Sequence, residues 1–284
     1  METISVCIAS YNTLSRGKEV LERAISSISD SIKYLYSQKN DVKVIISWVD
    51  DASTDGTLNE VIRLSNLQEN LIKDNFFINS IQVNKGQAYC RNLAANLYDS
   101  NYICLFDSDD EMYKDHLHVC LNMMSLEDKN GKKYALASTS LETSENDIHP
   151  DWISRMSNTA PITKIIRQEV WDFLEGMPES FIFKKIGQED AVFLLIFQKF
   201  FTNIMTSRVT TKYWNYPGSN LDKQIKKFQT DPNNYVEDFS ICPENMAILR
   251  DQFVKQKVEY LEQKLNLLNL HDKFNHLITK SPYN

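Results

Sequence analysis

Four carboxylates stand within five residues in the run Asp107-Ser108-Asp109-Asp110-Glu111. Carboxylates this close repel one another, so the run is costly unless a cation neutralises it. Ligands that offer only oxygen favour Mg²⁺ or Mn²⁺, and proteins usually hold these ions together with the phosphates of a substrate. A solvated acidic turn is the alternative, and the run alone leaves both interpretations open.

A second polar run covers residues 50–57, Asp50-Asp51-Ala52-Ser53-Thr54-Asp55-Gly56-Thr57. Asp51 and Ser53 are residue types that cap the first turn of a helix, and a helical pattern follows directly. A carboxylate in this loop is equally able to accept an N–H group from a nucleobase. The sequence therefore leaves two roles open for Asp51.

A third segment, Asn84-Lys85-Gly86, precedes a helical pattern that contains Arg91. Gly86 permits another group to approach the backbone closely. A guanidinium in the second turn of such a helix can reach a diphosphate. An exposed surface arginine is the plainer alternative for Arg91.

Each of these runs follows a segment with the pattern of a buried β-strand. We expect strands at residues 4–9, 42–49, 78–83, 102–106 and 134–139, and helices at residues 16–34, 57–67, 86–97 and 114–125. Strands buried on both faces that alternate with helices predict an α/β fold with a doubly wound parallel sheet. Such sheets bind ligands at the carboxyl ends of their strands, where the polar runs and the loop at 10–15 fall.

The second half of the chain is less regular. A helical pattern covers residues 163–175, a Gly-Met-Pro turn follows at 176–178, and an apolar helix is expected at 190–201. A long helix is expected at 243–270, with Pro243 at its first position. Its apolar stripe has coiled-coil spacing from residue 254 onward, which fits either packing against its own domain or a homodimer contact.

Composition narrows the classes of protein. The net charge is −7, which argues against a nucleic-acid scaffold with a basic face. The five cysteines form no CxxC pair and indicate small buried residues in a reducing compartment. The first residues lack the pattern of a signal peptide, and residues 193–204 are too short and too polar to span a bilayer. We therefore expect a cytoplasmic protein.

Taken together, these segments resemble the inverting family 2 glycosyltransferases, which have the GT-A fold. The segments that match in order are residues 6–12, 50–57, 84–86 with 91–92, 107–110, 167–179, 188–190 and 213–219. The resemblance covers residues 3–220 in the family's order and spacing. It implies a GT-A, mostly parallel sheet flanked by helices at 1–220, with a nucleotide-binding half at 1–110 and an acceptor-binding half at 111–220. Residues 221–284 would form a helical C-terminal extension.

The resemblance also implies roles for individual residues of the donor site. Ser10, Tyr11 and Asn12 would border the nucleoside, with Tyr11 beside the base, and Asp51 would accept the N–H group of the base. Gly86 and Arg91 would lie near the nucleotide, and Asp107 would hold the ribose or the donor sugar.

The metal, Mn²⁺ or Mg²⁺, would be bound by Asp109 with Asp107. Asp190 would be the general base that deprotonates the acceptor hydroxyl, with Glu189 and Tyr216 as supporting residues near the acceptor. An N-terminal acid of the helix at 190–201 is the alternative for Asp190.

The activity implied is metal-dependent, inverting transfer of a hexose from a nucleotide sugar, by default a UDP-sugar, to an acceptor hydroxyl. The acceptor would be a saccharide or a glycolipid in bacterial polysaccharide, lipopolysaccharide or capsule biosynthesis. Nucleic acid is not expected as a partner. A peripheral contact with the inner face of the plasma membrane is a further expectation. The apolar helix at 190–201 has two interpretations: it touches a lipid-linked acceptor, or it is a core helix.

Two departures from the family pattern keep an alternative open. Ala9 stands where a proline is usual, and Tyr216 stands where the family often has a histidine that assists the metal or the diphosphate. The alternative is a catalytically inactive partner subunit that still binds a nucleotide sugar. A nucleotidyltransferase is disfavoured because residues 10–15 contain neither glycine nor lysine, and no GxGxxG or P-loop motif occurs.

Overall fold

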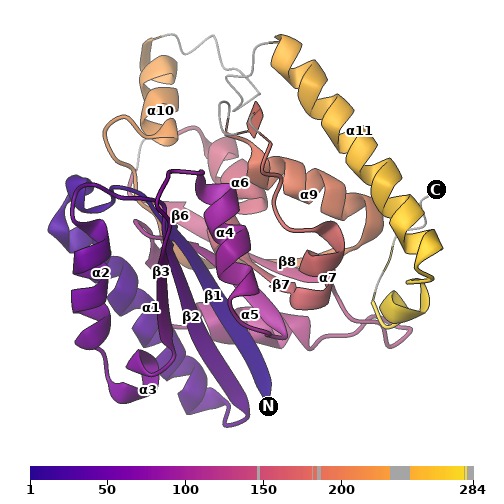
Figure 1. The fold of residues 1–284 in the computed structure, drawn as a ribbon, viewed down its shortest axis with the longest axis horizontal. Helices are drawn as coiled ribbons and strands as arrows, with labels where there is room; N and C mark the ends of the chain where they lie inside the picture. The colour runs from indigo at the N-terminus through magenta and orange to yellow at the C-terminus, as the bar shows by residue number, and fades with distance from the viewer. Residues whose placement is uncertain (146–147, 181, 184–186, 231–243, 278, 280–284) are drawn as a thin grey trace.

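The computed structural model describes residues 1–145, 148–180, 182–183, 187–230, 244–277 and 279. Its first half alternates strands and helices as predicted (Figure 1). The strands are β1 Glu2–Ser10, β2 Val42–Asp50, β3 Phe76–Ser80 and β4 Tyr102–Asp107. The helices are α1 Lys18–Gln38, α2 Thr57–Asn66, α3 Asn70–Lys73, α4 Gln87–Asn96 and α5 His116–Met124, with a short 3-10 turn η1 at Leu14–Arg16. The third strand begins and ends earlier than the predicted 78–83.

The sheet has eight strands in the order β3-β2-β1-β4-β7-β6-β8-β5. Strands β1 to β4 all pair in parallel. β7 (Lys164–Arg167) runs antiparallel to its neighbours β4 and β6 (Leu136–Thr143). β8 (Asn203–Tyr213) pairs in parallel with β6 and antiparallel with β5 (Glu111–Met112). The predicted fold class, a mostly parallel α/β sheet flanked by helices, is confirmed.

The helix predicted at 163–175 is wrong in its first part. A 3-10 turn η2 at Pro161–Thr163 leads into strand β7, and only α7 (Gln168–Leu174) is helical. Ile165 and Ile166 are buried between β4 and β6, where their backbones join the ladders of both neighbours. Pairing with strands that are distant in sequence outweighs the local helical pattern.

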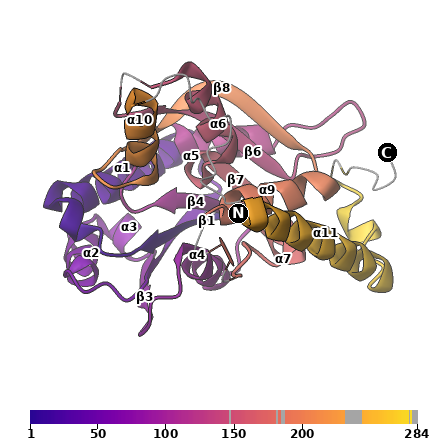
Figure 2. The same ribbon diagram turned by 90° about the horizontal axis from the view of Figure 1, so that it is seen from above.

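Helices cover both faces of the sheet (Figures 1 and 2). Successive side chains of β1 point to opposite faces of the sheet, and both faces are apolar. Ile4, Val6 and Ile8 pack with α1, α2 and α5, whereas Cys7 packs with the helices of the opposite layer. That layer contains α4, α7, α9 (Glu189–Phe200) and α11 (Glu244–Leu267). Further helices are α6 (Pro150–Thr159), α10 (Asn220–Thr230) and the 3-10 turn η3 (Asp272–Phe274).

The C-terminal helix α11 packs against α9 of the same chain. Its predicted start at Pro243 lies outside the described residues, and it ends at Leu267 rather than residue 270. The apolar stripe contributes Phe253, Val254, Val258, Leu261 and Leu265 to the core beneath it. The stripe therefore serves its own domain, which was one of the two interpretations left open.

Four of the five cysteines, Cys7, Cys90, Cys104 and Cys120, are free and buried, and Cys242 lies outside the described residues. Burial raises the pKa of the Cys7 thiol to about 12. Within the described part of the chain, no helix is both long and apolar enough to cross a membrane.

Candidate functional site

A cleft of about 490 Å³ opens at the carboxyl ends of β1, β2 and β4. Its walls come from the loops after these strands and from the segment that follows β8. The lining residues are Ala9, Ser10, Tyr11, Thr13, Arg16, Asp51, Asn84, Gly86, Gln87, Asp107, Ser108, Asp109, Tyr213, Trp214, Gly218 and Ser219. The cleft is where the parallel topology predicts a ligand site.

The loop after β1 is held to the loop after β2 by side-chain hydrogen bonds. Asn12 accepts a hydrogen bond from the Thr54 backbone (2.8 Å), and its own backbone donates to Ser53 Oγ (2.9 Å). Ser10 donates to the buried Asp50 (3.1 Å) and accepts from the Trp48 indole (2.9 Å). Tyr11 in this loop lines the cleft with 48% of its surface exposed.

Asp51 fixes the third loop. Its two carboxylate oxygens accept the backbone N–H groups of Lys85 (2.7 Å) and Gly86 (2.8 Å), and the residue is buried. Asp51 thus joins the β2 loop to the start of α4 instead of capping α2. Asp51 also lines the cleft. The contact of Asp51 with a nucleobase stays a prediction, and it would use the same carboxylate oxygens that bind the two backbone N–H groups.

Asp107 pairs with the predicted Arg91 at the base of the cleft. The Arg91 side chain is only 2% exposed, so the alternative of a surface arginine is excluded. Burial alone would lower the pKa of Arg91, but the negative charge of Asp107, with Glu189 and Asp190 beyond it, outweighs burial and raises that pKa. Arg91 is a permanent cation beneath the acidic loop.

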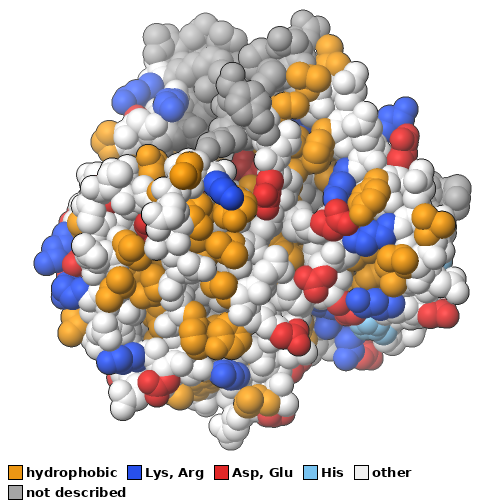
Figure 3. All heavy atoms as spheres, viewed as in Figure 1, with side chains coloured by type: hydrophobic (Ala, Val, Ile, Leu, Met, Phe, Trp, Pro, Cys, Tyr) orange, Lys and Arg blue, Asp and Glu red, His pale blue; other side chains and the backbone are white. Residues whose placement is uncertain are grey.

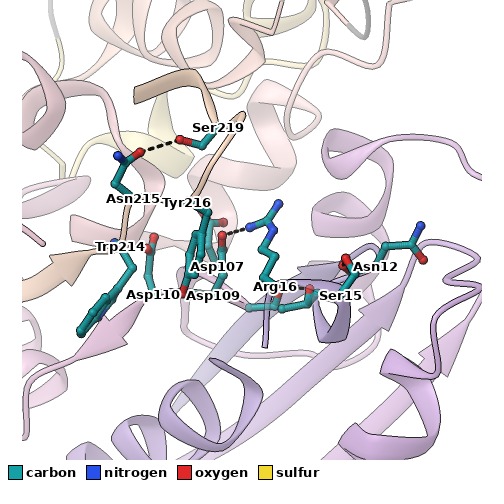
Figure 4. Close-up of polar contacts among 12 residues, drawn as sticks. Asn12, Ser15, Arg16, Asp107, Asp109, Asp110, Trp214, Asn215, Tyr216 and Ser219 are labelled. Carbon is teal, nitrogen blue, oxygen red and sulfur yellow. Dashed lines mark hydrogen bonds and ion pairs between the residues drawn. The ribbon is translucent and has the colours of Figure 1, made fainter. Parts of the chain in front are cut away.

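Asp109 pairs with Arg16, which the sequence did not single out (Figure 4). The Arg16 guanidinium also lies over the ring of Tyr216, 5.4 Å from its centroid. A second arginine, Arg23, donates to the Asp109 carbonyl (3.0 Å) and to the Tyr216 hydroxyl. Tyr216 in turn donates to the same carbonyl (2.9 Å). Where the family resemblance expects a histidine, this chain has a tyrosine held between two arginines.

Asp110 has a different environment from its neighbours. It is buried, it accepts the Trp214 backbone N–H group (2.8 Å), and its second oxygen has no hydrogen-bond partner. Burial, with the nearby charge of Asp107, raises the pKa of Asp110 well above its ordinary value. Asp110 therefore fastens the segment after β8 to the acidic loop.

Asp190 and Glu189 begin α9 beside the cleft. Gln87, which lines the cleft, donates to Glu189. Asp190 lines a separate small cavity of about 10 Å³ together with the buried Lys164. Burial raises the pKa of Asp190, and the charges of Arg91 and Lys164 oppose that rise. The predicted base is thus electrostatically coupled to the Arg91–Asp107 pair, although it is not in the wall of the larger cleft.

The structure brings most of the predicted donor residues to one place. Ser10, Tyr11, Asp51, Gly86, Asp107 and Asp109 line the cleft. Asn12 and Arg91 support it from behind, Asp190 and Glu189 lie at its edge, and Tyr216 contacts Asp109. The sequence analysis named the segments that contain Thr13, Asn84, Ser108, Tyr213 and Trp214 but gave these residues no role. It missed Arg16, Arg23 and Gln87, because their contacts join segments far apart in the chain.

The acidic loop offers ligands of the type that a hard cation needs. Asp107 and Asp109 both present carboxylate oxygens to the cleft. Among the residues that the structure describes, no group of three His, Cys, Asp or Glu side chains converges as a metal site. Mg²⁺ and Mn²⁺ sites that rely on one or two carboxylates are completed by water and substrate phosphates. The two carboxylates therefore fit a cation that is bound together with a phosphate ligand.

The fold and this acidic cleft define an α/β protein with a polar cleft at the carboxyl edge of a parallel sheet. The model described as "Glycosyl transferase family 2" matches residues 5–178, more than half of the chain. This chain belongs to glycosyl transferase family 2. No curated protein matches it.

Several solved structures have a similar fold. S. aureus TarS 1–349 in complex with UDP-GlcNAc aligns with a TM-score of 0.59 and 17% identity, covering 96% of this chain and 73% of that one. The mannosyltransferase PcManGT from Pyrobaculum calidifontis, in complex with GDP-Man and Mn²⁺, aligns with a TM-score of 0.57 and 14% identity, covering 94% and 75%. In two other TarS structures the alignment spans only 60% and 37% of the TarS chain. At these identities the likeness establishes the fold.

Proposed function

We propose that this family 2 glycosyltransferase is an active, metal-dependent, inverting enzyme that transfers a hexose from a nucleotide sugar to an acceptor hydroxyl. The observation that carries the proposal is the cleft itself. It unites Tyr11, the Asp51–Gly86 clamp, and the carboxylates of Asp107 and Asp109 at the carboxyl edge of the sheet.

The donor would lie along this cleft with its nucleoside between Ser10, Tyr11 and Asp51 and its diphosphate beside Asp107 and Asp109. We propose uridine as the base, since TarS, which is similar in fold, is solved with UDP-GlcNAc. Guanosine is the competing base, because PcManGT is solved with GDP-Man. Mn²⁺ or Mg²⁺ held by Asp109 and Asp107 would neutralise the charge of the leaving diphosphate.

Asp190 is proposed as the general base. Its carboxylate would take the proton from the acceptor hydroxyl as that oxygen attacks the anomeric carbon. The bond to the diphosphate oxygen breaks on the opposite side, which inverts the anomeric configuration. Glu189, held by Gln87, would position the start of α9, and Tyr216 would support the acidic loop through the Asp109 carbonyl. A raised pKa makes Asp190 a stronger base once it is ionised.

The acceptor is proposed to be a saccharide or glycolipid of bacterial surface polysaccharide assembly, handled in the cytoplasm with peripheral contact at the plasma membrane. We keep the division into a GT-A domain at 1–220, with nucleotide-binding and acceptor-binding halves, and a helical extension at 221–284. A homodimer through α11 would have to use the apolar side chains that its packing leaves exposed, Ile248, Leu249, Tyr260 and Leu267, with Leu268 just after the helix.

The alternative, an inactive partner subunit that binds nucleotide sugar, is favoured by two observations. Arg16 already neutralises Asp109, and no histidine stands at Tyr216.

A turnover assay separates the two functions. UDP-sugars and GDP-sugars are incubated with the protein and Mn²⁺, and slow hydrolysis is followed by ¹H NMR of the released sugar. An active inverting enzyme would release the β anomer first from an α-linked donor. Donor binding without any release, in water and with a panel of saccharide acceptors, would establish the inactive subunit, and first release of the α anomer would contradict inversion.

A further inference from the structure

The two arginine–carboxylate pairs of the acidic loop differ in how easily they can open. The Arg91 side chain is 2% exposed, so separating it from Asp107 would leave a buried charge without a partner. The Arg16 side chain is 40% exposed, and that of Asp109 is 20% exposed. Exposed ion pairs are weak, so the Arg16–Asp109 pair opens at little cost.

The backbone of Arg16 is held firmly although its side chain is exposed. In the η1 turn, Leu14 donates to Thr57 Oγ1 (2.9 Å) and Ser15 donates to Asp55 (2.7 Å). The Arg16 N–H group itself donates to the Thr13 carbonyl (3.1 Å). The backbone of Arg16 is therefore anchored beside the cleft, and the guanidinium can change partners by side-chain rotation alone.

Arg23 provides the contrast. Its guanidinium stacks on Trp214 at 4.0 Å and donates to the Asp109 carbonyl and to Tyr216, so its contacts fix the scaffold of the loop. Within the described residues, the Arg16 guanidinium donates to no backbone carbonyl, so an exchange of partners would break no contact of that kind. Its partners are the Asp109 carboxylate and the face of the Tyr216 ring.

We infer that Arg16 is an exchangeable cation of the donor site: it neutralises Asp109 while the donor is absent and binds the donor diphosphate when a divalent cation takes its place at Asp109. A guanidinium binds carboxylates and phosphates through the same fork of N–H donors, so one side chain serves both partners. The inference rests on the proposed function, because it requires Asp109 to be a metal ligand. It adds a diphosphate-binding residue supplied by the η1 turn.

The test measures ligand binding by calorimetry in the full-length chain, with UDP and GDP as probes and uridine and guanosine as the matching nucleosides. The variant is Arg16→Gln, and the control is Arg63→Gln, which removes another exposed arginine paired with Glu60 on α2. With Mn²⁺ present, Arg16→Gln should weaken binding of the nucleoside diphosphate about tenfold or more, as expected for a lost charge-assisted hydrogen bond. Affinity for the nucleoside should stay unchanged.

Titration with Mn²⁺ in the absence of a nucleotide should show the opposite effect of Arg16→Gln, a tighter binding of the ion. Without Arg16 as a competitor, the affinity of Asp109 for Mn²⁺ should rise several-fold. If the diphosphate instead binds Arg16→Gln as tightly as the wild type, or more tightly, Arg16 only blocks Asp109 and the inference is overturned.

Asp109→Asn separates this failure from failure of the proposed function. If Asp109→Asn still binds the nucleoside diphosphate in a Mn²⁺-dependent way, Asp109 is not a metal ligand, irrespective of the result with Arg16→Gln. If it loses that dependence while Arg16→Gln behaves as the wild type, the metal assignment stands and only the exchange is wrong.

Discussion

Asp107 and Asp109 stand two residues apart and have separate environments. Asp107 is tied to a buried arginine, and Asp109 to an exposed one. Of this arrangement, the sequence could predict the carboxylates and Arg91, because they occupy a recognisable run and helix turn. It could not predict Arg16, which lies 93 residues from Asp109 and carries no motif. Contacts of this kind exist only once the sheet has brought β1 beside β4.

Replacing Asp109 tests the metal site at this scale. Asp109→Asn keeps the size of the side chain but removes its charge, so we expect Mn²⁺-dependent binding of a nucleoside diphosphate to be lost. The matched control is Asp30→Asn on the exposed face of α1. Calorimetry with and without EDTA measures both variants. Mn²⁺-dependent binding at wild-type affinity in Asp109→Asn would remove this residue from the site.

Replacing Asp190 tests the proposed base. Asp190→Asn should retain donor binding and reduce turnover by about 10²-fold or more. The base acts only when ionised, and its pKa is raised, so the rate in the wild type should fall with decreasing pH before an ordinary aspartate with a pKa of 3.8 would titrate. A profile of kcat/KM against pH measures this fall of the rate on the acid side. A variant with wild-type turnover would refute the assignment.

The burial of Lys164 should make the stability of the fold depend on pH. Burial lowers its pKa from 10.5 to about 7, although its ammonium donates to Ser157, Ala160 and Thr163. Between these pH values the unfolded chain binds more protons at this site than the folded chain, so the free energy of unfolding rises with pH, by at most about 1.4 kcal/mol per pH unit.

The measurement compares urea unfolding of the wild type and Lys164→Met at about pH 7.5 and about pH 9. The wild type should gain stability relative to the variant as pH rises. A difference between the two proteins that does not change with pH would mean that Lys164 titrates normally.

At the scale of elements, strand β7 and helix α11 decide how the second half of the molecule is built. The sequence did not predict β7, because its four residues are stabilised by pairing with two strands that are distant in the chain and not by a local pattern. α11 was visible because a long helix carries its apolar period within itself. Its last turns are also tied to α7, where Glu175 accepts hydrogen bonds from Lys257, Tyr260 and Lys264.

Two leucines of α11 test this packing. Leu261 is fully buried, whereas Leu267 is 83% exposed at the end of the same helix. Leu261→Ala should lower the free energy of unfolding by about 2–5 kcal/mol, because it removes buried methyl groups and leaves a cavity. Leu267→Ala should change it by less than about 0.5 kcal/mol. Equal effects of the two substitutions in denaturant unfolding would show that α11 does not pack on the core.

At the scale of the whole molecule, a sheet covered on both faces places the loops that line the cleft along one edge, and the net charge is −7. In Figure 3, Lys and Arg side chains on the side that is drawn are scattered among Asp and Glu. Of the two arginines paired with the acidic loop, Arg16 lines the cleft and Arg91 is buried beneath it. This architecture followed from the alternation of strands and helices in the sequence, whereas the chemistry of the donor and acceptor depends on cleft shape that no pattern encodes.

The most direct test of the account is a thermal-shift screen of the full-length chain against UDP-, GDP-, dTDP- and CMP-sugars, each with Mn²⁺ and again with EDTA. A ligand well above its dissociation constant stabilises the folded state by about 3 kcal/mol. We predict that one nucleotide class, the UDP-sugars, raises the melting temperature with Mn²⁺ and loses this effect with EDTA. No stabilisation by any nucleotide sugar in the presence of Mn²⁺ would contradict a metal-assisted donor site in this cleft.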